Sequence, residues 1–375
     1  MDDSRITSFQ RAERLLAVGD RTPGGWLLAP LVPLSHLYGL AMRARAALYA
    51  RGLLRQQILP CRVISVGNLT VGGTGKTPVV IALAAALRDR GRKVGVISRG
   101  YKRRSGTSIL EISDGRTLRG HPEDSGDEPF LIAQHCLGVP VAVGADRPLV
   151  GRYLVDRFDL DTLVLDDGFQ HLALRRDMDI LVLDAGAPFG NGYLLPRGRL
   201  REPLSAMDRA SAVLVTRASQ AQRLDELKAT VRAVSPAVPI WITDFALSAV
   251  VRVGSEAAAE PSAPKGERVL AVSGIGNPES FRRLLTAAGA TVVDHCVFPD
   301  HHAYSVDDLQ RVRSAAEQAD VDRIVTTEKD AVKLAQFNEV KNQQVAIWAV
   351  RIDLQWLEGL EEWERIVLQG DRQLF

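Results

Sequence analysis

The sequence has few cysteines and almost no net charge. Its 47 Lys and Arg residues nearly balance its 45 Asp and Glu residues, which leaves a net charge of +2. A basic surface suited to nucleic acid is therefore not expected, although local basic patches remain compatible with this total. The cysteines lie far apart and form no CxxC pair, which excludes a small disulfide-built protein and favours a reducing compartment; they are Cys61, Cys136 and Cys296.

The sequence also lacks a long uninterrupted apolar run. Acidic Asp2 and Asp3 stand where a secretory signal would carry basic residues. The most apolar early stretch, residues 26–42, is interrupted by prolines, a histidine and a glycine. A spanning helix needs about 20 nearly continuous apolar residues. Neither a secretory signal nor a membrane-spanning helix is therefore predicted in this region.

A different pattern begins after Pro33. Apolar and aromatic residues recur there at helical spacing beside a group of arginines: Leu34, Leu37, Tyr38, Ala41 and Leu48, with Arg43, Arg45, Arg51 and Arg55. An amphipathic helix of this kind either packs its apolar side on the protein core or lies in a membrane interface. Core packing is the commoner arrangement, and the residues alone leave both open.

Length and composition are those of an ordinary globular protein. The 375 residues are 46% hydrophobic and 25% charged, which excludes a wholly disordered or collagen-like chain. At about 150 residues per domain, two domains are expected.

The strongest local pattern is a glycine-rich loop. The β-branched run Arg62–Val66 is typical of a buried strand, and Val79–Arg90 predicts a helix. The loop between them, residues 67–78, reads GNLTVGGTGKTP, with Thr70 where the usual pattern has its first glycine. This order predicts a P-loop in which backbone N–H groups and Lys76 bind phosphates while the Thr77 hydroxyl binds Mg²⁺. The phosphate-binding residues would be Gly72, Gly73, Thr74, Gly75, Lys76 and Thr77.

A second element of a phosphate site follows at residues 161–168. This apolar run ends in Asp166 and Asp167, which resembles a Walker B strand whose carboxylate holds Mg²⁺ or its water shell. The sequence leaves open which of the two aspartates contacts the metal.

Further apolar runs predict the fold class. Lys93–Ser98, Ile180–Asp184 and Ala212–Thr216 are typical of buried strands that alternate with helices. This alternation predicts an α/β fold, a P-loop NTPase-like parallel sheet flanked by helices. Because ligands bind at the carboxyl ends of parallel strands, we expect the P-loop, Arg99 and the Asp166–Asp167 pair to converge.

The domain boundary is predicted near Val251. Gly254–Gly266 is rich in Ala, Glu, Pro and Ser, which is typical of a linker. Arg268–Ser273 predicts a strand, and Asn277 is expected to cap the helix that follows. We expect a P-loop domain over residues 1–250 that includes the N-terminal helix, a linker over 251–267, and a smaller α/β domain over 268–375.

Five more local patterns narrow the reaction. They are SRGYKR at 98–103, GDEP at 126–129, LDDGFQH at 165–171, LPRGRLREP at 195–203 and FPDHH at 298–302. With the P-loop, this ordered set over about residues 20–335 resembles the tetraacyldisaccharide 4'-kinase (lipid A 4'-kinase) family. The family usually has glycine where Lys102 stands. It also shares the TEKD run at 327–330, to which the sequence assigns no role.

The resemblance implies ATP- and Mg²⁺-dependent transfer of the γ-phosphoryl group to a glycolipid. The acceptor would be the 4'-hydroxyl of the tetraacylated glucosamine disaccharide 1-phosphate, and the product lipid IVA in lipid A biosynthesis. A peripheral protein on the cytoplasmic face of the bacterial inner membrane is implied, with its active site between the two domains. This favours the membrane interface for the Leu34–Arg55 helix. A monomer is expected, with no nucleic-acid partner.

The resemblance also implies site residues. Asp127 matches the catalytic aspartate in GDEP, and His301 matches the histidine that orients this carboxylate or relays its proton. Without the resemblance, Asp127 is more typical of a helix N-cap, which would also fix the position of its carboxylate, and His301 is typical of a surface turn, with His302 as a neighbouring competitor. Arginines suit a phosphorylated lipid because they bind phosphate bidentately. The expected substrate-binding residues are Arg99, Tyr101, Gln170, His171, Arg199, Arg201 and Glu202.

A P-loop alone also fits other reactions. One alternative is a GTPase or metal-chaperone-type NTPase that binds a partner protein, and another is an ATP-dependent carboxylate–amine ligase. The first would explain Lys76 and the Asp166–Asp167 pair, but not the Asp127–His301 pair or the arginine groups.

Overall fold

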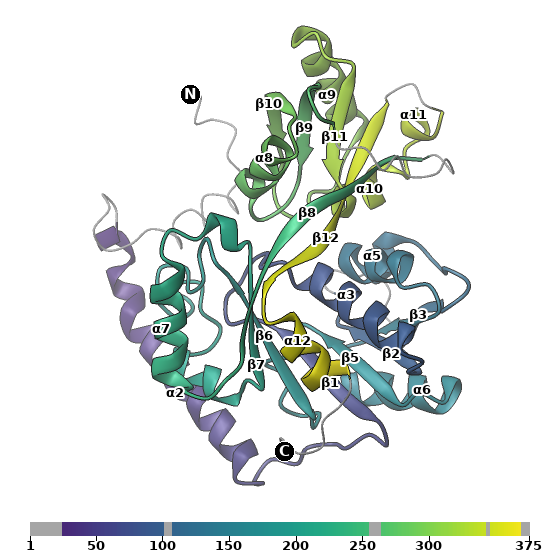
Figure 1. Cartoon of the computed structure of the whole chain (residues 1–375). Helices are drawn as coiled ribbons and strands as arrows, with labels where there is room; N and C mark the ends of the chain where they lie inside the picture. Colours follow the sequence, from purple (N-terminus) through teal and green to yellow (C-terminus); the bar gives the residue numbers. More distant parts are fainter. Residues whose placement is uncertain (1–24, 101–106, 255–263, 343–345, 369–375) are drawn as a thin grey trace.

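The computed structural model describes residues 25–100, 107–254, 264–342 and 346–368. A twelve-stranded sheet connects the described strands in the order β10-β9-β11-β12-β8-β7-β6-β1-β5-β2-β4-β3. Helices pack against this sheet. In Figure 1 the strands from the C-terminal part of the chain lie above those from the N-terminal part. We call residues 25–254 the N-terminal lobe and residues 264–342 the C-terminal lobe.

The N-terminal lobe confirms the predicted parallel sheet. Neighbouring strands from β8 to β4 are parallel, and the edge strand β3 runs antiparallel to β4. Apart from β3 and β8, its strands are buried along almost their whole length because helices cover both faces of the sheet. The strands are β1 (Arg62–Gly67), β2 (Val94–Ser98), β3 (Leu110–Asp114), β4 (Pro140–Val143), β5 (Thr162–Asp166), β6 (Met178–Asp184), β7 (Ala212–Thr216) and β8 (Ile240–Arg252).

Helices of the N-terminal lobe pack through apolar residues spaced three and four apart. In α3, Val79, Val80, Leu83 and Leu87 are buried against the sheet. The α-helices are α2 (Val32–Ala50), α3 (Lys76–Asp89), α4 (Pro122–Ser125), α5 (Asp127–His135), α6 (Arg147–Phe158) and α7 (Leu224–Val234). Short 3-10 segments are η2 (Gly25–Leu31), η3 (Leu204–Arg209) and η4 (Ala218–Gln220).

The C-terminal lobe is a smaller α/β unit. Its parallel strands are β9 (Arg268–Ser273), β10 (Thr291–Val297) and β11 (Arg323–Thr327). The expected cap is confirmed, because the Asn277 side chain accepts a hydrogen bond from the Ser280 N–H at 3.1 Å. Its helices are α8 (Pro278–Ala287), α9 (Val306–Gln318), α10 (Glu328–Leu334) and α11 (Asn338–Lys341).

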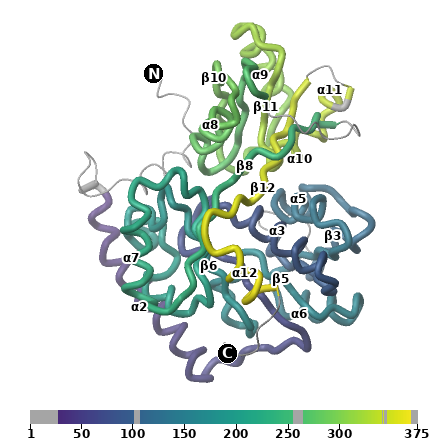
Figure 2. The backbone as a smooth tube through the Cα atoms, viewed as in Figure 1, coloured from purple at the N-terminus to yellow at the C-terminus, as the bar shows by residue number. Residues whose placement is uncertain are grey.

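A long antiparallel pair, β8 with β12 (Ile347–Glu358), joins the lobes (Figures 1 and 2). The chain then returns to the N-terminal lobe as α12 (Leu360–Trp363) and the π-helical turn η5 (Glu364–Leu368). There the Trp363 ring packs edge-on against Trp241, with centroids 5.2 Å apart. The last described residues therefore belong to the N-terminal core. The predicted domain boundaries at 250 and 268 stay a prediction.

Helix α2 lies on the N-terminal lobe through small residues. Its buried positions are Ser35 and Gly39, and a Cβ at Gly39 would come within 2.6 Å of Leu194. Its leucines face outward: the exposed fractions of Leu37 and Leu40 are 63% and 62%. The leucines of the apolar side therefore do not pack on the core, whereas Tyr38 is half-buried against the lobe. Within the described ranges, no helix has the length and apolarity needed to cross a bilayer.

Candidate active site

The glycine-rich loop connects β1 to the N-terminus of α3. Gly75 caps this helix with φ at +81°, and a Cβ there would approach the Phe245 ring to 2.6 Å, so glycine is required. At the start of α3, the Lys76 ammonium donates to Asn68 Oδ1 at 3.1 Å and pairs with Asp167 at 3.4 Å. A helix N-terminus with free N–H groups beside a lysine is an anion-binding site.

Two carboxylates lie at the end of β5, at the same edge of the sheet: Asp166 is its last residue and Asp167 follows. Ser98 donates to Asp166 Oδ2 at 2.7 Å, whereas the buried Oδ1 has no hydrogen-bond partner among the described residues. Burial and the negative charge of Glu128 raise the pKa of Asp166 to about 7. For Asp167, the charges of Lys76 and Arg201 outweigh burial and hold the pKa well below its ordinary value.

The second pair of predicted residues meets across the lobes. His301 Nδ1 lies 3.2 Å from Asp127 Oδ2, and Lys333 Nζ lies 3.5 Å from the same oxygen. Burial opposes ionisation of Asp127, but the hydrogen bond from His301 and the charge of Lys333 lower its pKa. The residue that caps α5 is Gly126, and no side-chain cap bond is present. The N-cap interpretation of Asp127 is therefore wrong.

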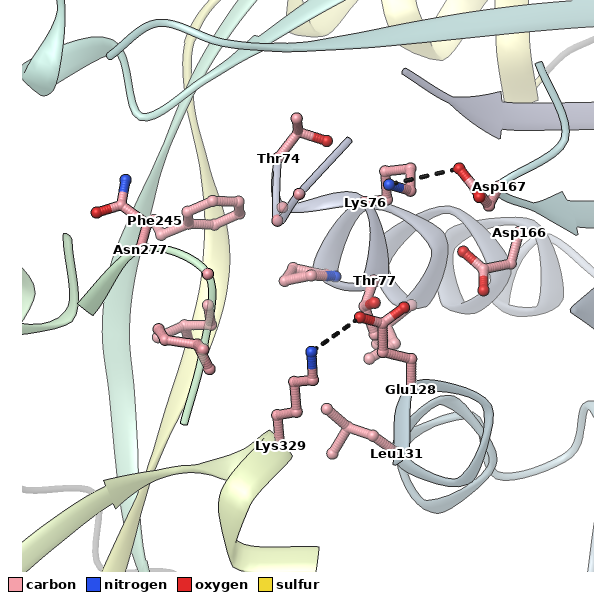
Figure 3. A pocket seen from close by; sticks show the side chains of 18 of the residues that line it. Thr74, Lys76, Thr77, Glu128, Leu131, Asp166, Asp167, Phe245, Asn277 and Lys329 are labelled. Carbon is pink, nitrogen blue, oxygen red and sulfur yellow. Dashed lines mark hydrogen bonds and ion pairs between the residues drawn. The ribbon is translucent and has the colours of Figure 1, made fainter. Parts of the chain in front are cut away.

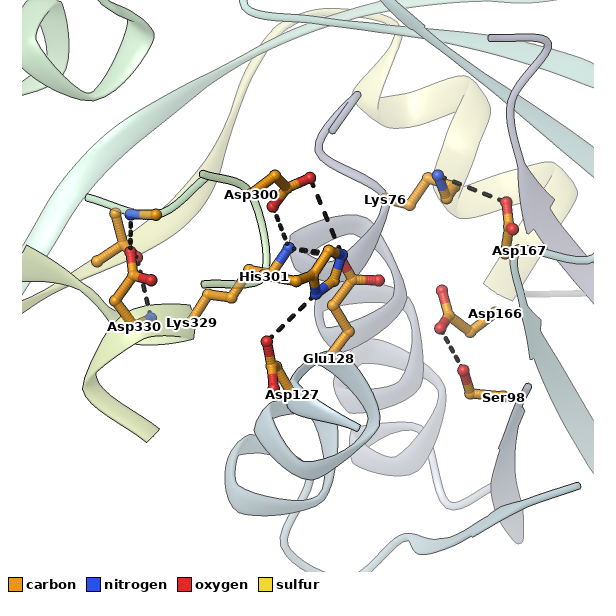
Figure 4. Close-up of polar contacts among 12 residues, drawn as sticks. Lys76, Ser98, Asp127, Glu128, Asp166, Asp167, Asp300, His301, Lys329 and Asp330 are labelled. Carbon is orange, nitrogen blue, oxygen red and sulfur yellow. Dashed lines mark hydrogen bonds and ion pairs between the residues drawn. The ribbon is translucent and has the colours of Figure 1, made fainter. Parts of the chain in front are cut away.

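Lys329 is a site residue to which the sequence assigns no role. Its Nζ lies 2.9 Å from Asp300 Oδ1, 3.2 Å from Glu128 Oε1 and 3.2 Å from His301 Nε2. Figure 4 shows these side chains converging from both lobes beside the Asp127–His301 pair. The TEKD run at 327–330 was the only sequence feature that pointed to Lys329. Its contact with Glu128 depends on how α10 packs on α5, which the sequence does not show.

The P-loop, the two aspartates at the end of β5, Asp127, His301 and Lys329 line one cleft of about 1660 Å³ between the lobes. In Figure 3, Lys76 and Asp167 border one side of it, and the Lys329–Glu128 ion pair borders another. The predicted residues that line it are Gly72, Gly73, Thr74, Gly75, Lys76, Thr77, Arg99, Asp127, Asp166, Asp167, Gln170, His171, Arg201 and His301. Predicted Tyr101 lies outside the described residues.

Two predicted substrate residues lie outside the lining of this cleft. Arg199 Nε donates to the Val71 carbonyl at 3.2 Å, and its side chain borders a smaller cavity of about 260 Å³ beside the P-loop. Glu202 is buried and accepts two hydrogen bonds from Arg209, at 2.7 and 3.1 Å. The structure thus places both residues next to the site rather than in it.

Arg201 and Gln170 form the part of the cleft nearest α2. Arg201 Nη1 donates to both Asp167 oxygens, at 3.0 and 2.9 Å, and to Gln170 Oε1 at 3.2 Å. From α2, Tyr38 donates to the Arg201 carbonyl at 2.8 Å and Arg45 to the Gln170 carbonyl at 3.0 Å. Helix α2 is therefore bonded to both loops that carry these residues.

His171 and Arg147 border the same end of the cleft. Burial and the neighbouring charge of Arg147 lower the pKa of His171 to about 4, so this imidazole is neutral at pH 7. Arg147 is buried, and its Nε has no hydrogen-bond partner among the described residues. Sequence reasoning missed Arg147, because a lone arginine at a helix start carries no distinctive pattern.

Comparison with known proteins identifies the family. The family model for tetraacyldisaccharide-1-P 4'-kinase (LpxK) matches residues 27–369. The chain belongs to this family. A tetraacyldisaccharide 4'-kinase of Syntrophus aciditrophicus is 43% identical over 84% of this chain and 86% of its own length. One from an Anaeromyxobacter species is 44% identical over 89% of both chains.

A solved structure supports the same assignment for the fold. It is described as an apo form of LpxK from Aquifex aeolicus in complex with ATP, with a TM-score of 0.71 and 30% identity. It covers 92% of this chain and 99% of the other. The predicted P-loop α/β fold and family are confirmed. The chain is an ATP-using kinase of the tetraacyldisaccharide 4'-kinase family rather than a GTPase-type protein or a ligase.

Proposed function

We propose that the cleft transfers the γ-phosphoryl group of ATP to the 4'-hydroxyl of the tetraacylated glucosamine disaccharide 1-phosphate. The bond from the γ-phosphorus to its bridging oxygen breaks, and a bond from the sugar oxygen to that phosphorus forms. The hydroxyl proton goes to Asp127, and lipid IVA and ADP leave. The observation that carries the proposal is that the P-loop and the Asp127–His301 pair face one cleft.

The P-loop side would hold the phosphates of ATP. Residues 72–77 present the N–H groups of a loop and a helix N-terminus, which favour negative charge. Lys76 is kept at the mouth of this loop by Asn68 and Asp167. Its ammonium would offset charge on the transferred phosphoryl group.

The residues beside the P-loop fit a Mg²⁺ ion. Asp166 Oδ1 is buried without a hydrogen-bond partner among the described residues, and carboxylate oxygen is a ligand that Mg²⁺ prefers. Asp167 is already paired with Lys76 and Arg201. Asp166 and the Thr77 hydroxyl would therefore hold the metal, with Asp167 beside them. When bound, Mg²⁺ supplies positive charge that offsets the charge developing on the phosphates.

Asp127 is the proposed proton acceptor. His301 and Lys333 both contact its Oδ2, which leaves Oδ1 for the proton of the sugar hydroxyl. Because the pKa of Asp127 is lowered, the carboxylate is ionised and ready to accept at neutral pH.

The Arg201 end of the cleft is the proposed glycolipid side. Arg99 and Arg201 would bind phosphate or sugar oxygens, and Gln170 and neutral His171 would add hydrogen bonds. We keep Tyr101 in this group as a proposal. Arg199 and Glu202 would act indirectly, through the Val71 carbonyl and through Arg209.

We further propose that α2 seats the protein, as a monomer, on the cytoplasmic face of the inner membrane. Its outward leucines lie next to arginines, as in interfacial helices. Because α2 is bonded to the Arg201 and Gln170 loops, a lipid bound at the membrane would meet the glycolipid side of the cleft.

The test is phosphoryl transfer from labelled ATP to the disaccharide 1-phosphate in detergent micelles. Asp127→Asn should lower kcat about 10²- to 10⁴-fold, since it removes the general base, and should leave the Kd for ATP within about twofold, because Asp127 lies across the cleft from the P-loop.

Asp124→Asn is a matched control, because Asp124 is an acidic residue just ahead of α5 and lies outside the lining of the cleft. Near-normal turnover by Asp127→Asn, or ATP hydrolysis that does not depend on the glycolipid, would contradict the proposal.

A further inference from the structure

We propose that Lys329 is a positioning residue that fixes the tautomer of His301, so that Nδ1–H points at Asp127 while Nε2 accepts from the lysine. The inference rests on the proposed function, in which Asp127 receives the substrate proton. It gives Lys329 a part in the reaction, and it distinguishes between two roles for His301, which are to orient the Asp127 carboxylate or to relay its proton.

The first step is the hydrogen bonding of Lys329. An ammonium group has three N–H donors and no acceptor. The Nζ has three neighbours within 3.2 Å, namely Asp300 Oδ1, Glu128 Oε1 and His301 Nε2. Burial lowers the pKa of Lys329, but the charges of Glu128 and Asp300 outweigh it and raise the pKa. The ammonium group is therefore protonated and all three N–H donors are present. His301 Nε2 therefore accepts.

The second step concerns the other ring nitrogen. A neutral imidazole carries one N–H and one acceptor nitrogen. With Nε2 as acceptor, the hydrogen is on Nδ1, which lies 3.2 Å from Asp127 Oδ2. The lysine, the imidazole and the carboxylate thus form one directed chain of hydrogen bonds (Figure 4).

The backbone of His301 is strained. His301 has φ at +58°, a left-handed conformation that non-glycine residues seldom adopt. Its N–H donates to the Gly274 carbonyl at 3.2 Å. A strained conformation persists only where surrounding contacts impose it, and here the contacts of the ring with Asp127 and Lys329 do so.

This chain limits what His301 does in the reaction. Nδ1 already carries a hydrogen, and Nε2 is occupied by the lysine. The proton of the sugar hydroxyl therefore stops on Asp127, and His301 orients the carboxylate rather than relaying its proton. Lys329 acts through His301 and is not itself a catalytic residue.

Lys333 provides an internal control on the same helix. It stands four residues after Lys329 in α10, and its ion pairs are with Asp127 Oδ2 at 3.5 Å and Asp330 Oδ1 at 3.2 Å. Lys333→Met removes a positive charge near Asp127 without removing the donor to Nε2. Lys329→Met removes that donor.

The test is a long-range ¹H–¹⁵N correlation spectrum of the full-length protein with ¹⁵N-labelled histidine. His301→Gln assigns the signal of His301 among the seven histidines. The wild type and Lys333→Met should both show the Nδ1–H tautomer. Lys329→Met should show loss of that tautomer's dominance, with kcat at least about tenfold lower and a smaller change in the Kd for ATP.

A wild-type His301 that carries its hydrogen on Nε2, or on both nitrogens, would overturn the inference even if the Lys329 variant fails to fold. So would an unchanged tautomer in Lys329→Met. Failure of the proposed function is a separate result: near-normal turnover by Asp127→Asn would remove the base whatever the tautomer of His301.

Discussion

On one wall of the cleft, backbone geometry places the charged groups, whereas on the other wall side-chain ion pairs place them. The P-loop wall consists of residues 72–77 with Asp166 and Asp167. The α5/α10 wall consists of Asp127, Glu128, Asp300, His301 and Lys329. The first is made by a local strand–loop–helix unit, and the second by segments of both lobes.

The walls also differ in how their carboxylates are compensated. Each carboxylate of the α5/α10 wall contacts a lysine or histidine, and their pKa values are lowered despite burial. On the P-loop wall, Asp166 has a raised pKa and one buried oxygen without a partner among the described residues. A complete ion-pair network suits orientation of a base, whereas an uncompensated carboxylate suits binding of a cation.

The largest expected effect separates nucleotide binding from proton transfer. Lys76→Met should lower kcat/KM by about 10³-fold and weaken ATP binding, because it removes the cation at the phosphates. His301→Gln should lower kcat by about 10- to 10²-fold with an unchanged Kd for ATP. Steady-state kinetics and calorimetric titration of ATP measure both. If His301→Gln weakens ATP binding as much as Lys76→Met does, nucleotide binding and proton transfer are not separated between the two walls.

The second prediction tests the uncompensated carboxylate. Between pH 3.8 and about 7, the folded protein holds a proton on Asp166 that the unfolded chain has lost, so this group reduces stability as pH rises. A shift of about 3 pKa units corresponds to at most about 4 kcal/mol. Asp166→Asn should therefore unfold at higher denaturant concentration than the wild type at pH 8, without nucleotide, and with little difference near pH 4.

The measurement is urea unfolding at several pH values. Asp127→Asn is the matched control from the α5/α10 wall, and it should destabilise at pH 8 because its pKa is lowered. If both variants shift the urea midpoint equally and in the same direction, the carboxylates of the two walls do not differ in how their charge is compensated.

The third prediction tests the backbone of the P-loop wall. Gly75→Ala should reduce the free energy of unfolding by about 1–3 kcal/mol, because φ is +81° and the new Cβ meets Phe245. Gly73→Ala is the control: its Cβ has no neighbour within 4 Å, and its φ lies outside the left-handed region. Thermal melts compare the two. Equal melting temperatures would mean that the loop adapts and that its geometry is not fixed.

The smallest effect concerns α2, which lines the cleft near Arg201 through Tyr38, Met42 and Arg45. Replacing Leu34, Leu37 and Leu40 by Gln should weaken binding to anionic liposomes about tenfold, since apolar area is lost from the interface. ATP affinity should not change. Leu149→Gln, an exposed leucine on α6, is the control. If the triple variant binds liposomes as well as the wild type, α2 does not seat the protein on the membrane.

Sequence reasoning succeeded where the signal was local. The strands, the P-loop helix and the position of Asp166 follow from apolar periodicity and glycine spacing, and the structure confirms the fold that these imply. Asp127 and His301 were paired only through resemblance, since 174 residues separate them in the chain. Lys329, Lys333 and Arg147 went unassigned because single charged residues on helices are common on protein surfaces.

The sequence by itself determined the P-loop, because a backbone turn that needs glycine and a helix start that follows it are properties of a dozen consecutive residues. The tertiary structure alone decided which charges oppose each other. The antiparallel β8–β12 pair brings α10 against α5, and only then does Lys329 reach both Glu128 and His301. Electrostatic contacts depend on distances of a few ångströms, and such distances between remote segments are decided by how the lobes pack.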